Sequence, residues 1–365
     1  PPTPEPPPTT PATTGLPDEL DTSLIGLQGH FVIPDQQDML LDMSAYDLKV
    51  GWVKQQVDWA VIEYIPGDYT VYLGALDGFV NGAFDRNMNV LLSFAHAPDW
   101  ARTTPDQDGP PTNYEDYYRF VTIKLTRYKG KVQAVEVWNE PNLRREWVGA
   151  ELNGASYVEL LAGAYPVIKA VDPSIVVVSA GLAPTGVTSD LAVDDRLYFR
   201  QMYEAGVRQH ADALGIHPYG WANPPEVLCC GQPGSGPSHN DHPSFFFLDT
   251  IQDYRAIQAE FGDSERPLWA TEFGWGTMQS LGLEVPAEQP FFQHVNEQQQ
   301  AMYIVDAFRL AQTLDYMGPM FLWNLNVATL DGFDPNQAGY SILRDELDRP
   351  RPAYEQLRDY PRSTE

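Results

Sequence analysis

The chain has 365 residues and contains 50 Asp+Glu against 23 Lys+Arg, which gives a formal net charge of −27. Such a charge repels nucleic-acid phosphates and anionic lipids, so we expect neither nucleic acid nor a membrane as a partner. Hydrophobic residues make up 43% of the sequence, enough for a large packed core. No run of about 18 apolar residues predicts a membrane-spanning helix. The length suits either one α/β barrel or two smaller domains.

Residues 1–17, PPTPEPPPTTPATTGLP, consist mostly of Pro and Thr. This composition cannot form a core, so it predicts an extended, disordered linker over residues 1–21 and a folded domain over residues 22–360. The linker either joins the domain to another domain or to a cell surface, or is a terminus without a role. The first interpretation favours a secreted or cell-surface protein. No basic-then-apolar signal segment begins the chain, so either none existed or it has been removed.

Eight short apolar runs follow in chain order, at Leu24–Leu27, Val50–Val57, Asn89–Phe94, Val132–Trp138, Ile175–Ser179, Ala213–His217, Leu268–Thr271 and Pro319–Trp323. Longer stretches with helical spacing lie between most of them, such as Tyr114–Tyr128 and Gln298–Leu314. Strands that alternate with helices indicate a parallel sheet, and eight such units predict a closed (β/α)8 TIM barrel. The turn at Gly26–Gly29 lacks the glycine spacing of a dinucleotide-binding site.

Two glutamates stand at the ends of predicted strands. Glu140 ends the fourth strand in the segment VEVWNEPN, and Glu272 ends the seventh in LWATEFGW. Because barrel enzymes place reacting groups at the carboxyl ends of their strands, we expect these carboxylates to face each other across the barrel mouth. Two such groups can cleave a glycosidic bond, one by donating a proton and the other by attacking the anomeric carbon. A lone strand-end Glu is as often a salt-bridge partner, but a pair flanked by Trp favours catalysis.

The segments WNEPN (residues 138–142) and TEFGW (residues 271–275) resemble clan A of the retaining glycoside hydrolases, most of all its family 39 and family 5-type enzymes. The resemblance extends over nearly the whole chain after the linker. It implies that Glu140 is the general acid/base, that Glu272 is the nucleophile and that Asn139 binds the 2-hydroxyl of the cleaved sugar. It further implies hydrolysis of β-glycosidic bonds in an oligo- or polysaccharide, without a cofactor or a metal.

Other strand ends carry residues that the resemblance places beside the sugar. His217 and Tyr219 close the sixth strand, where clan members often carry a His or aromatic residue that orients the nucleophile. Trp323, at the end of the eighth strand, matches the aromatic floor beneath the sugar. His96, after the third strand, is expected to contact a sugar hydroxyl, although a structural role fits its position equally well.

The second strand departs from the clan pattern. Many members carry an Arg there that supports the nucleophile, whereas this chain has the sequence VKQQV with Lys54. Lysine supplies the charge but not the bidentate fork of arginine, so either Lys54 takes the role or another group such as Gln56 does. Glu136 shares a strand face with Glu140 by two-residue alternation and lies deeper, so we expect it to pair with a buried basic group.

Aromatic residues that follow strand ends are candidates for sugar stacking, because the axial face of a sugar ring is apolar. They are Trp100, Trp147, Trp221 and Trp275, and core packing is an equal alternative for each. The long segments Trp221–Leu248 and Asp331–Tyr340 are expected to shape the cleft. Whether they leave an open groove for endo action or a blind pocket for exo action stays open.

Cys229 and Cys230 are too few for a disulfide framework and are either a vicinal disulfide or two thiols. The nearest approach to a metal site is the segment His239–His242, for which a chance cluster in a loop is favoured. Two other functions stay open, a transglycosylase that uses the same two glutamates and an inactive carbohydrate-binding barrel. The two mutually repelling carboxylates count against the inactive barrel, which gains little from them.

Overall fold

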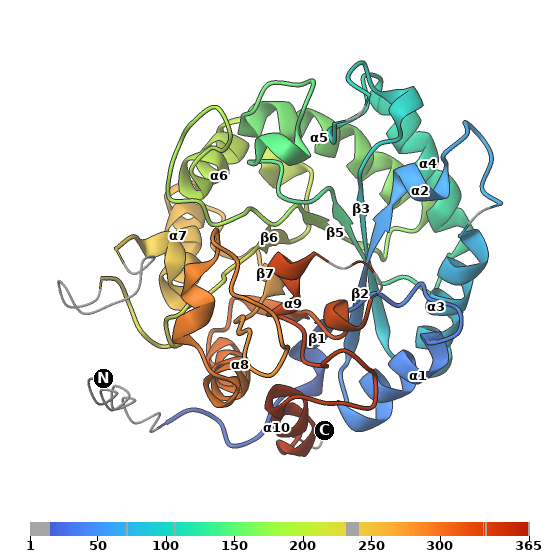
Figure 1. Cartoon of the computed structure of the whole chain (residues 1–365). Coiled ribbons are helices and arrows are strands. Elements are labelled where there is room, and N and C mark those ends of the chain that lie inside the picture. The colour runs from blue at the N-terminus through green and yellow to red at the C-terminus, as the bar shows by residue number, and fades with distance from the viewer. Residues whose placement is uncertain are drawn as a thin grey trace.

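The computed structural model describes residues 15–70, 72–105, 107–230, 241–330, 332 and 334–363. Its strands form one parallel eight-stranded sheet in the order β5-β4-β3-β2-β1-β8-β7-β6. The strands are β1 Ile25–Gln28, β2 Trp52–Asp58, β3 Asn89–Ala95, β4 Ala134–Val137, β5 Val176–Ser179, β6 Leu214–Ile216, β7 Leu268–Phe273 and β8 Met317–Trp323. Figure 1 shows them at the centre of the molecule within a ring of helices. The predicted (β/α)8 barrel is confirmed, and each predicted strand corresponds to an observed one.

The sheet closes into a barrel between its end strands, β5 and β6. Val178 and Ala213 form a parallel bridge, and the Ser179 amide donates to the Ala213 carbonyl oxygen at 3.1 Å. The strands approach closely here, since a Cβ atom on Gly215 would lie 2.2 Å from the Ser179 carbonyl oxygen. A glycine at this position is therefore what lets the last pair of strands meet.

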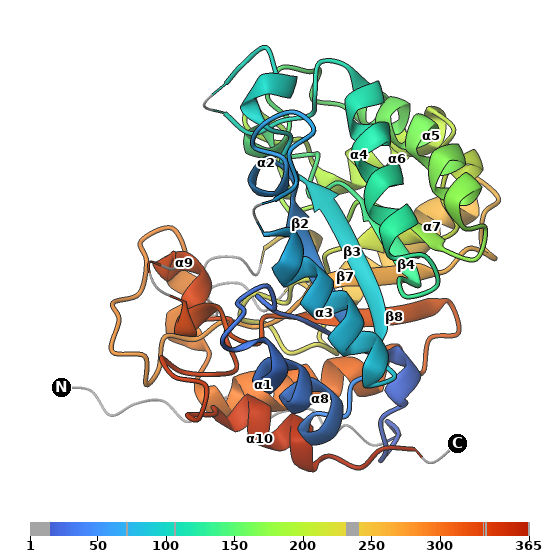
Figure 2. The same ribbon diagram turned by 90° about the vertical axis from the view of Figure 1, so that its right-hand side faces the viewer.

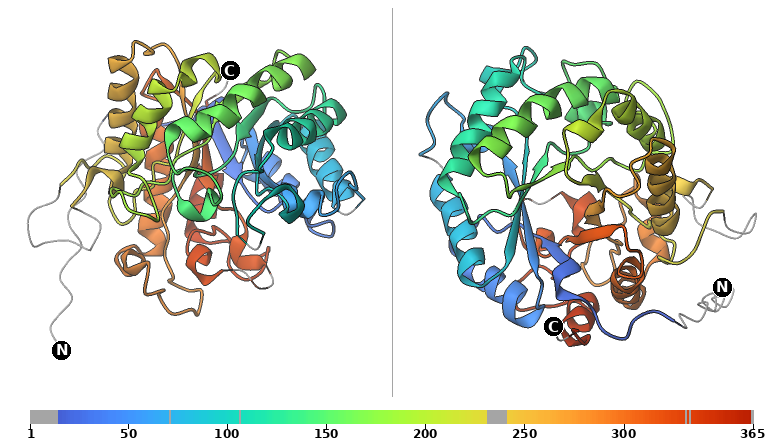
Figure 3. Two further views of the ribbon diagram at one scale, coloured as in Figure 1. Left: turned by 90° about the horizontal axis from the view of Figure 1, so that it is seen from above. Right: turned by 180° about the vertical axis from the view of Figure 1, so that it is seen from behind.

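The helices are α1 Gln37–Asp42, α2 Trp59–Ile62, α3 Leu73–Asp85, α4 Tyr114–Arg127, α5 Gly154–Val171, α6 Asp195–Glu204, α7 Phe247–Glu260, α8 Glu297–Ala311, α9 Pro335–Ala338 and α10 Pro352–Asp359. Helices α4 and α8 correspond to the two helices that the sequence predicted. Asn296 forms a capping box with Gln299 at the start of α8. Within the described ranges, none of these helices has the length and apolar composition that crossing a bilayer requires. The views from above and behind show the helices surrounding the sheet (Figure 3).

The short helix α9 stands apart from the outer ring. Along the barrel axis it lies over the centre of the molecule (Figure 1), and the side view shows it beyond the strands together with the loops before α8 (Figure 2). Helix α9 thus lies at the mouth of the barrel, where the segment after β8 was expected to shape a cleft.

The end of the predicted linker lies against the barrel. Arg309 donates to the Pro17 carbonyl oxygen at 2.7 Å. Leu20 is fully buried, and its amide donates to the Pro361 carbonyl oxygen at 2.9 Å. The folded domain therefore begins before residue 22, because an apolar side chain and backbone groups just upstream find partners on it. The rest of the predicted linker, residues 1–14, lies outside the described residues.

The barrel interior changes from apolar to polar along its axis. Its amino-terminal end is filled by an apolar cluster, made of Trp52, Leu91, Ala134, Val178, Ala213, Trp269 and Phe321. Two residues further along β2, β3, β4 and β7, the fully buried side chains are polar: Lys54, Ser93, Glu136 and Thr271. Buried polar groups need hydrogen-bond or ion-pair partners. This polar layer lies directly below the carboxyl ends of the strands, where barrel enzymes have their active sites.

Candidate active site

Glu140 and Glu272 face each other across the barrel mouth, after β4 and at the end of β7. One carboxylate oxygen of each glutamate and a ring nitrogen of His217 all lie within 4.8 Å of one another. The glutamate side chains are only 12% and 9% exposed. Both line a cleft of about 870 Å³ at the carboxyl ends of the strands. The structure therefore brings together the two carboxylates that the sequence placed on opposite sides of the mouth.

The backbone around Glu140 is held in an unfavourable conformation. Trp138 and Glu140 have φ angles of 75° and 41°, in the left-handed region that residues with a side chain seldom adopt. His96, at the end of the neighbouring strand β3, has a φ of 59°. The Glu140 amide donates to the Gly181 carbonyl oxygen at 3.1 Å, which ties the turn to the end of β5. Such strain is typical of functional sites, where the surrounding structure holds a side chain in one position.

Two donors hold the carboxylate of Glu272. The Tyr219 hydroxyl donates to Oε2 at 3.0 Å, and the Lys54 ammonium donates to Oε1 at 3.4 Å. Lys54 also donates to the Thr271 carbonyl oxygen at 3.0 Å. The sequence left open whether Lys54 or Gln56 supports Glu272. Lys54 makes this contact, and Gln56 lines the cleft. Donors to both oxygens stabilise the negative charge that a nucleophile needs.

Lys54 also forms a buried ion pair with Glu136. The Lys54 Nζ atom lies 2.8 Å from Glu136 Oε2, and neither side chain has exposed surface. Burial opposes the charge on Lys54, but Glu136 and Glu272 outweigh it and raise the pKa of the ammonium. Burial likewise opposes the charge on Glu136 and raises its pKa. The charge of Lys54 outweighs this effect, so the pKa of the Glu136 carboxyl lies below its ordinary value. Glu136 thus has the buried basic partner that the sequence predicted.

Two basic side chains hold the carboxylate of Glu140. The His217 Nδ1 atom lies 3.1 Å from Oε1, and the Arg145 guanidinium donates to Oε2 at 3.1 Å. Burial raises the pKa of Glu140, but the hydrogen bond and charge of His217, followed by Arg145, bring it below the ordinary value. Burial lowers the pKa of His217, and the two glutamates reverse this and raise it. His217 is 4.0 Å from Glu272, so its closer partner is Glu140 and not the expected nucleophile.

His96 lies between two carboxylates at the edge of the cleft. Its ring nitrogens are 3.4 Å from Asp58 and 3.4 Å from Glu146. Although burial opposes its charge, these hydrogen bonds raise the pKa of His96 to about 10. The ring is therefore an imidazolium at neutral pH. It lines the cleft, where it was expected to contact a sugar.

Other predicted sugar-binding residues line the same cleft. Asn139 is 7% exposed, and its Oδ1 atom has no hydrogen-bond partner among the described residues. Trp323 is partly exposed and packs edge-on against Tyr340, with ring centres 5.2 Å apart. Trp221 also lines the cleft. The cleft thus combines a buried polar atom that has no partner with partly exposed aromatic side chains.

The expectation that Trp275 and Trp147 stack on a sugar is wrong. Neither side chain has exposed surface, because both are packed in the core around the barrel. The Trp275 indole donates to the Asn223 carbonyl oxygen at 2.8 Å. Trp100 is half-buried and packs edge-on against Trp59. For these three residues the alternative of core packing holds.

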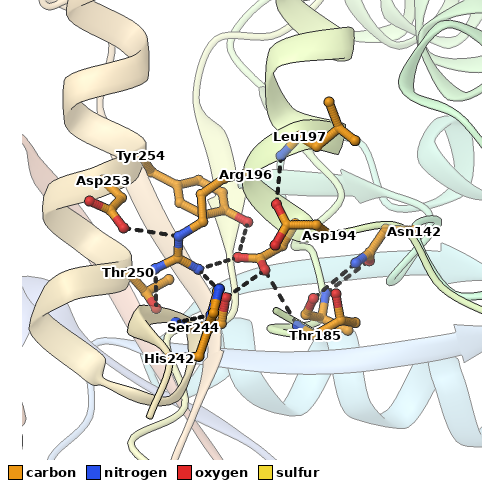
Figure 4. A network of polar contacts seen from close by, with 12 residues as sticks. Asn142, Thr185, Asp194, Arg196, Leu197, His242, Ser244, Thr250, Asp253 and Tyr254 are labelled. Carbon is orange, nitrogen blue, oxygen red and sulfur yellow. Dashed lines mark hydrogen bonds and ion pairs between the residues drawn. The ribbon is translucent and has the colours of Figure 1, made fainter. Parts of the chain in front are cut away.

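The wall of the cleft beyond Glu140 is formed by the loop between β5 and α6, and a buried network fixes it. The Asn142 amide donates to the Ala183 and Val193 carbonyl oxygens at 2.9 and 3.1 Å. Asp195 accepts hydrogen bonds from the Thr185 amide at 3.3 Å and from Ser244 and Tyr254 on the neighbouring segment. Figure 4 shows how these contacts join the loop to the start of α6 and to α7. This wall is therefore preformed.

The two long segments expected to shape the cleft do so. Trp221 and Phe245 contribute from the segment after β6, and the segment after β8 contributes Asp334, Asn336, Gln337 and Tyr340. Cys229 and Cys230, in the first of these segments, form a disulfide, which resolves the alternative left open by the sequence.

The predicted metal candidate falls partly outside the described residues, since residues 239 and 240 are not among them. His242 uses its Nδ1 atom to accept a hydrogen bond from the Ser244 amide. Glu140, His217 and Glu272 have the spacing of a metal site. Both glutamates, however, already have a cationic partner, Lys54 for Glu272 and Arg145 for Glu140, which disfavours a metal ion at this position.

Sequence reasoning missed Arg145 and Tyr340. Arg145 lies five positions after Glu140 in the short 3-10 helix Arg144–Glu146, and this turn brings it back to the carboxylate. Tyr340 packs against both Tyr219 and Trp323, which lie on other strand ends. No periodic signal marks either residue, because their positions depend on how the loops fold.

No protein-family model matches the sequence, and neither does any curated protein. Solved structures with a similar fold include a family 39 glycoside hydrolase from Bacteroides cellulosilyticus WH2 (TM-score 0.69, 20% identity, covering 93% of this chain and 63% of that one). A family 39 β-xylosidase from Caulobacter crescentus has a TM-score of 0.62 and 15% identity, with 94% of this chain and 71% of that one covered. An exo-β-1,4-mannosidase from Opitutaceae bacterium strain TAV5 has a TM-score of 0.61 and 18% identity, with 96% and 62% covered. The chain thus spans less than two thirds of the length of the Bacteroides and Opitutaceae proteins. It shares its fold with glycoside hydrolases, including members of family 39, the family that its sequence resembles.

Proposed function

We propose that this chain is a retaining β-glycoside hydrolase in which Glu140 is the acid/base and Glu272 the nucleophile. The observation that carries the proposal is the approach of their carboxylate oxygens to within 4.8 Å. Retaining enzymes have carboxyl groups about 5–5.5 Å apart, whereas inverting enzymes leave roughly 6.5–9.5 Å for a water molecule. The short separation favours direct attack by a carboxylate.

In the first step, Glu140 gives its proton to the glycosidic oxygen while Glu272 attacks the anomeric carbon. The bond from the anomeric carbon to that oxygen breaks, the leaving group departs as an alcohol and a glycosyl ester forms on Glu272. In the second step, water attacks the anomeric carbon, Glu140 takes up the proton of that water, and the Glu272 carboxylate is released. Tyr219 and Lys54 stabilise the charge of Glu272 before attack and after release.

Glu140 needs a proton when the first step begins, yet its cation partners hold its pKa below the ordinary value in the free chain. A proton shared with His217 can meet this need, because the His217 Nδ1 atom is only 3.1 Å from the carboxylate. A sugar bound in the cleft displaces water from Glu140, and this desolvation raises the pKa of the carboxyl and draws the proton onto it.

Alanine variants test the two roles on a panel of aryl β-glycosides. Glu140→Ala keeps activity only toward good leaving groups, and added azide restores turnover and gives a β-glycosyl azide. Glu272→Ala loses hydrolysis, and azide gives the α-glycosyl azide. Glu288→Ala, at the rim of the same cleft, is the matched control and retains activity. The opposite azide products would overturn the assignment, and no turnover by the unaltered chain on any glycoside would overturn the proposed function.

A further inference from the structure

A second cavity of about 380 Å³ adjoins the catalytic cleft at the ends of β1, β2 and β3. The two hollows share the lining residues Gln56, His96, Trp323 and Gln337. The cavity therefore borders the cleft along these four residues. Its volume lies within the range of about 300–1,000 Å³ found for small-molecule sites.

The cavity contains a buried polar atom without a partner. Gln28, at the end of β1, is 5% exposed, and its Oε1 atom has no hydrogen-bond partner within the described ranges. The neighbouring Gln55 is also buried but is satisfied, because its Oε1 atom accepts from the Phe31 amide at 2.9 Å. Burying an amide oxygen without a partner is costly, so the Gln28 side chain is suited to a ligand that donates a hydrogen bond.

The charges in the cavity cancel. Asp58 and His96 lie 3.4 Å apart and form an ion pair, and burial lowers the pKa of His30, which keeps this ring neutral at neutral pH. The other described lining residues are uncharged: one part of the wall carries amides, and another carries apolar side chains such as Ile62 and Leu76. A neutral group with hydroxyls on its edge and apolar C–H faces fits this lining, whereas a uronic acid or a phosphate does not.

The cavity also opens outward over exposed apolar side chains. Val61 and Tyr72 line it and are 40% and 54% exposed. Opposite, beyond Glu140, the cleft ends at Val187 and Leu191, which are 59% and 74% exposed. Exposed apolar side chains thus line both the cavity and the cleft.

The position of Glu140 gives the groove a direction. Glu140 lines the cleft but not the second cavity, and its backbone is tied to the β5 end by the Gly181 contact. The acid that protonates the leaving oxygen therefore stands on the β5 side. The leaving group occupies that side, and the second cavity lies on the side of the sugar that becomes attached to Glu272.

We infer that this cavity is a binding site for a second, neutral sugar unit on the glycone side of the cleaved bond. The inference rests on the proposed function and deepens it. The substrate is a β-linked chain that fills the cavity with the unit next to the cleaved one, and the smallest glycone released efficiently is a disaccharide. Gln28 accepts a hydrogen bond from a hydroxyl of that unit, and Tyr72 offers its ring at the outer edge.

Pairs of 4-nitrophenyl β-glycosides that differ by one glycone unit test this inference, since the leaving group is the same. The probes are the glucoside with the cellobioside, the xyloside with the xylobioside, and the mannoside with the mannobioside. For the sugar that fits the cavity, we expect kcat/KM for the disaccharide glycoside to exceed that for the monosaccharide glycoside by roughly tenfold or more. A tenfold difference corresponds to about 1.4 kcal/mol of added binding free energy. Nitrophenol and intact disaccharide should appear together.

Two variants and a control link the effect to the cavity. Val61→Trp fills the cavity opening and should reduce kcat/KM for the disaccharide to the level of the monosaccharide, with the monosaccharide rate within about twofold of the unaltered chain. Gln28→Met keeps the side-chain length but removes the acceptor, and should lower the disaccharide rate roughly 3–10-fold. Ile65→Trp is the control and should change neither rate, because Ile65 lies three residues after helix α2, is 57% exposed and is not among the residues that line the cavity.

Three results would overturn the inference while leaving hydrolysis itself intact. These are equal or faster cleavage of the monosaccharide glycoside, release of a single sugar from the disaccharide glycoside as the first product, and a Val61→Trp variant that behaves like Ile65→Trp. Absence of hydrolysis for every probe would instead overturn the proposed function, and this inference with it.

Discussion

Lys54 and Glu136 form an ion pair of 2.8 Å in which neither side chain has any exposed surface. The same ammonium reaches Glu272 at 3.4 Å, so one buried cation serves two carboxylates. Glu136 lies below the cleft and anchors the cation, whereas Glu272 opens into it. The roles of Lys54 in stability and in the reaction can therefore be separated by changing Glu136 as well.

Replacing Lys54 by Met leaves two buried carboxylates without their cation. Removing one partner of a buried pair costs about 3–5 kcal/mol, so the free energy of unfolding should fall by that amount in urea titrations. The double variant Lys54→Met with Glu136→Gln should regain much of the stability but not kcat, because Glu272 keeps the Tyr219 hydrogen bond but still lacks the Lys54 cation. Recovery of full activity in the double variant would show that Lys54 acts on the fold alone.

Arg145 should set the alkaline limit of activity. Its charge holds the pKa of Glu140 down, so Arg145→Met raises that pKa and moves the alkaline limb of the kcat/KM profile to higher pH. An exposed pair is worth about 0.2–1 kcal/mol, which corresponds to a shift of roughly 0.1–0.7 pH units. Arg145→Lys keeps the charge and is the control. A limb that moves to lower pH in Arg145→Met would contradict the proposed role of the ion pair.

His96 should make stability depend on pH in the alkaline range. Its pKa rises from an ordinary 6.5 to about 10 in the folded chain, so its contribution is complete below pH 6.5 and is lost as the pH rises through 10. His96→Asn suits the left-handed backbone and should lower the free energy of unfolding by roughly 1–3 kcal/mol at pH 6. The difference from the unaltered chain should shrink toward pH 10. A difference that is constant with pH would show that the ring is not held as an imidazolium.

Asn139 should matter for the reaction and not for the fold. Its Oδ1 atom has no partner in the described structure, so Asn139→Ala should leave the midpoint of thermal unfolding nearly unchanged. If Asn139 binds a sugar hydroxyl in the transition state, kcat should fall by about 10²–10³-fold, as for other groups that stabilise developing charge. Equal kcat in the variant would remove Asn139 from the proposed machinery.

The (β/α)8 barrel could be predicted from the sequence because the spacing of hydrophobic residues indicates the strands and helices directly. Each strand contains or overlaps one of the predicted apolar runs, and Glu140 and Glu272 lie just after the end of β4 and near the end of β7. Their meeting over the mouth follows from parallel strands closing into a barrel, since this brings all carboxyl ends to one face. Lys54 and Glu136 were predictable for the same reason, because alternation along a strand fixes which side chains point inward.

The other details of the site depend on how loops fold and side chains pack, which local sequence patterns do not predict. Trp275 follows a strand end just as Trp323 does, but it turns into the core while Trp323 faces the cleft. His217 proved closer to Glu140 than to Glu272, a difference of less than 1 Å that no spacing rule resolves. Arg145 reaches Glu140 only because the turn after β4 folds back.

The most direct test of the account is to trap the ester on Glu272. A 2-deoxy-2-fluoro β-glycoside with a dinitrophenyl leaving group forms the ester and hydrolyses it slowly, because the fluorine destabilises both oxocarbenium-like transition states. Mass spectrometry should find one fluoroglycosyl unit per chain, located on the peptide that contains Glu272 and absent from the Glu272→Gln variant. Label on another residue, or turnover of an ordinary glycoside to the inverted anomer without any label, would contradict the account.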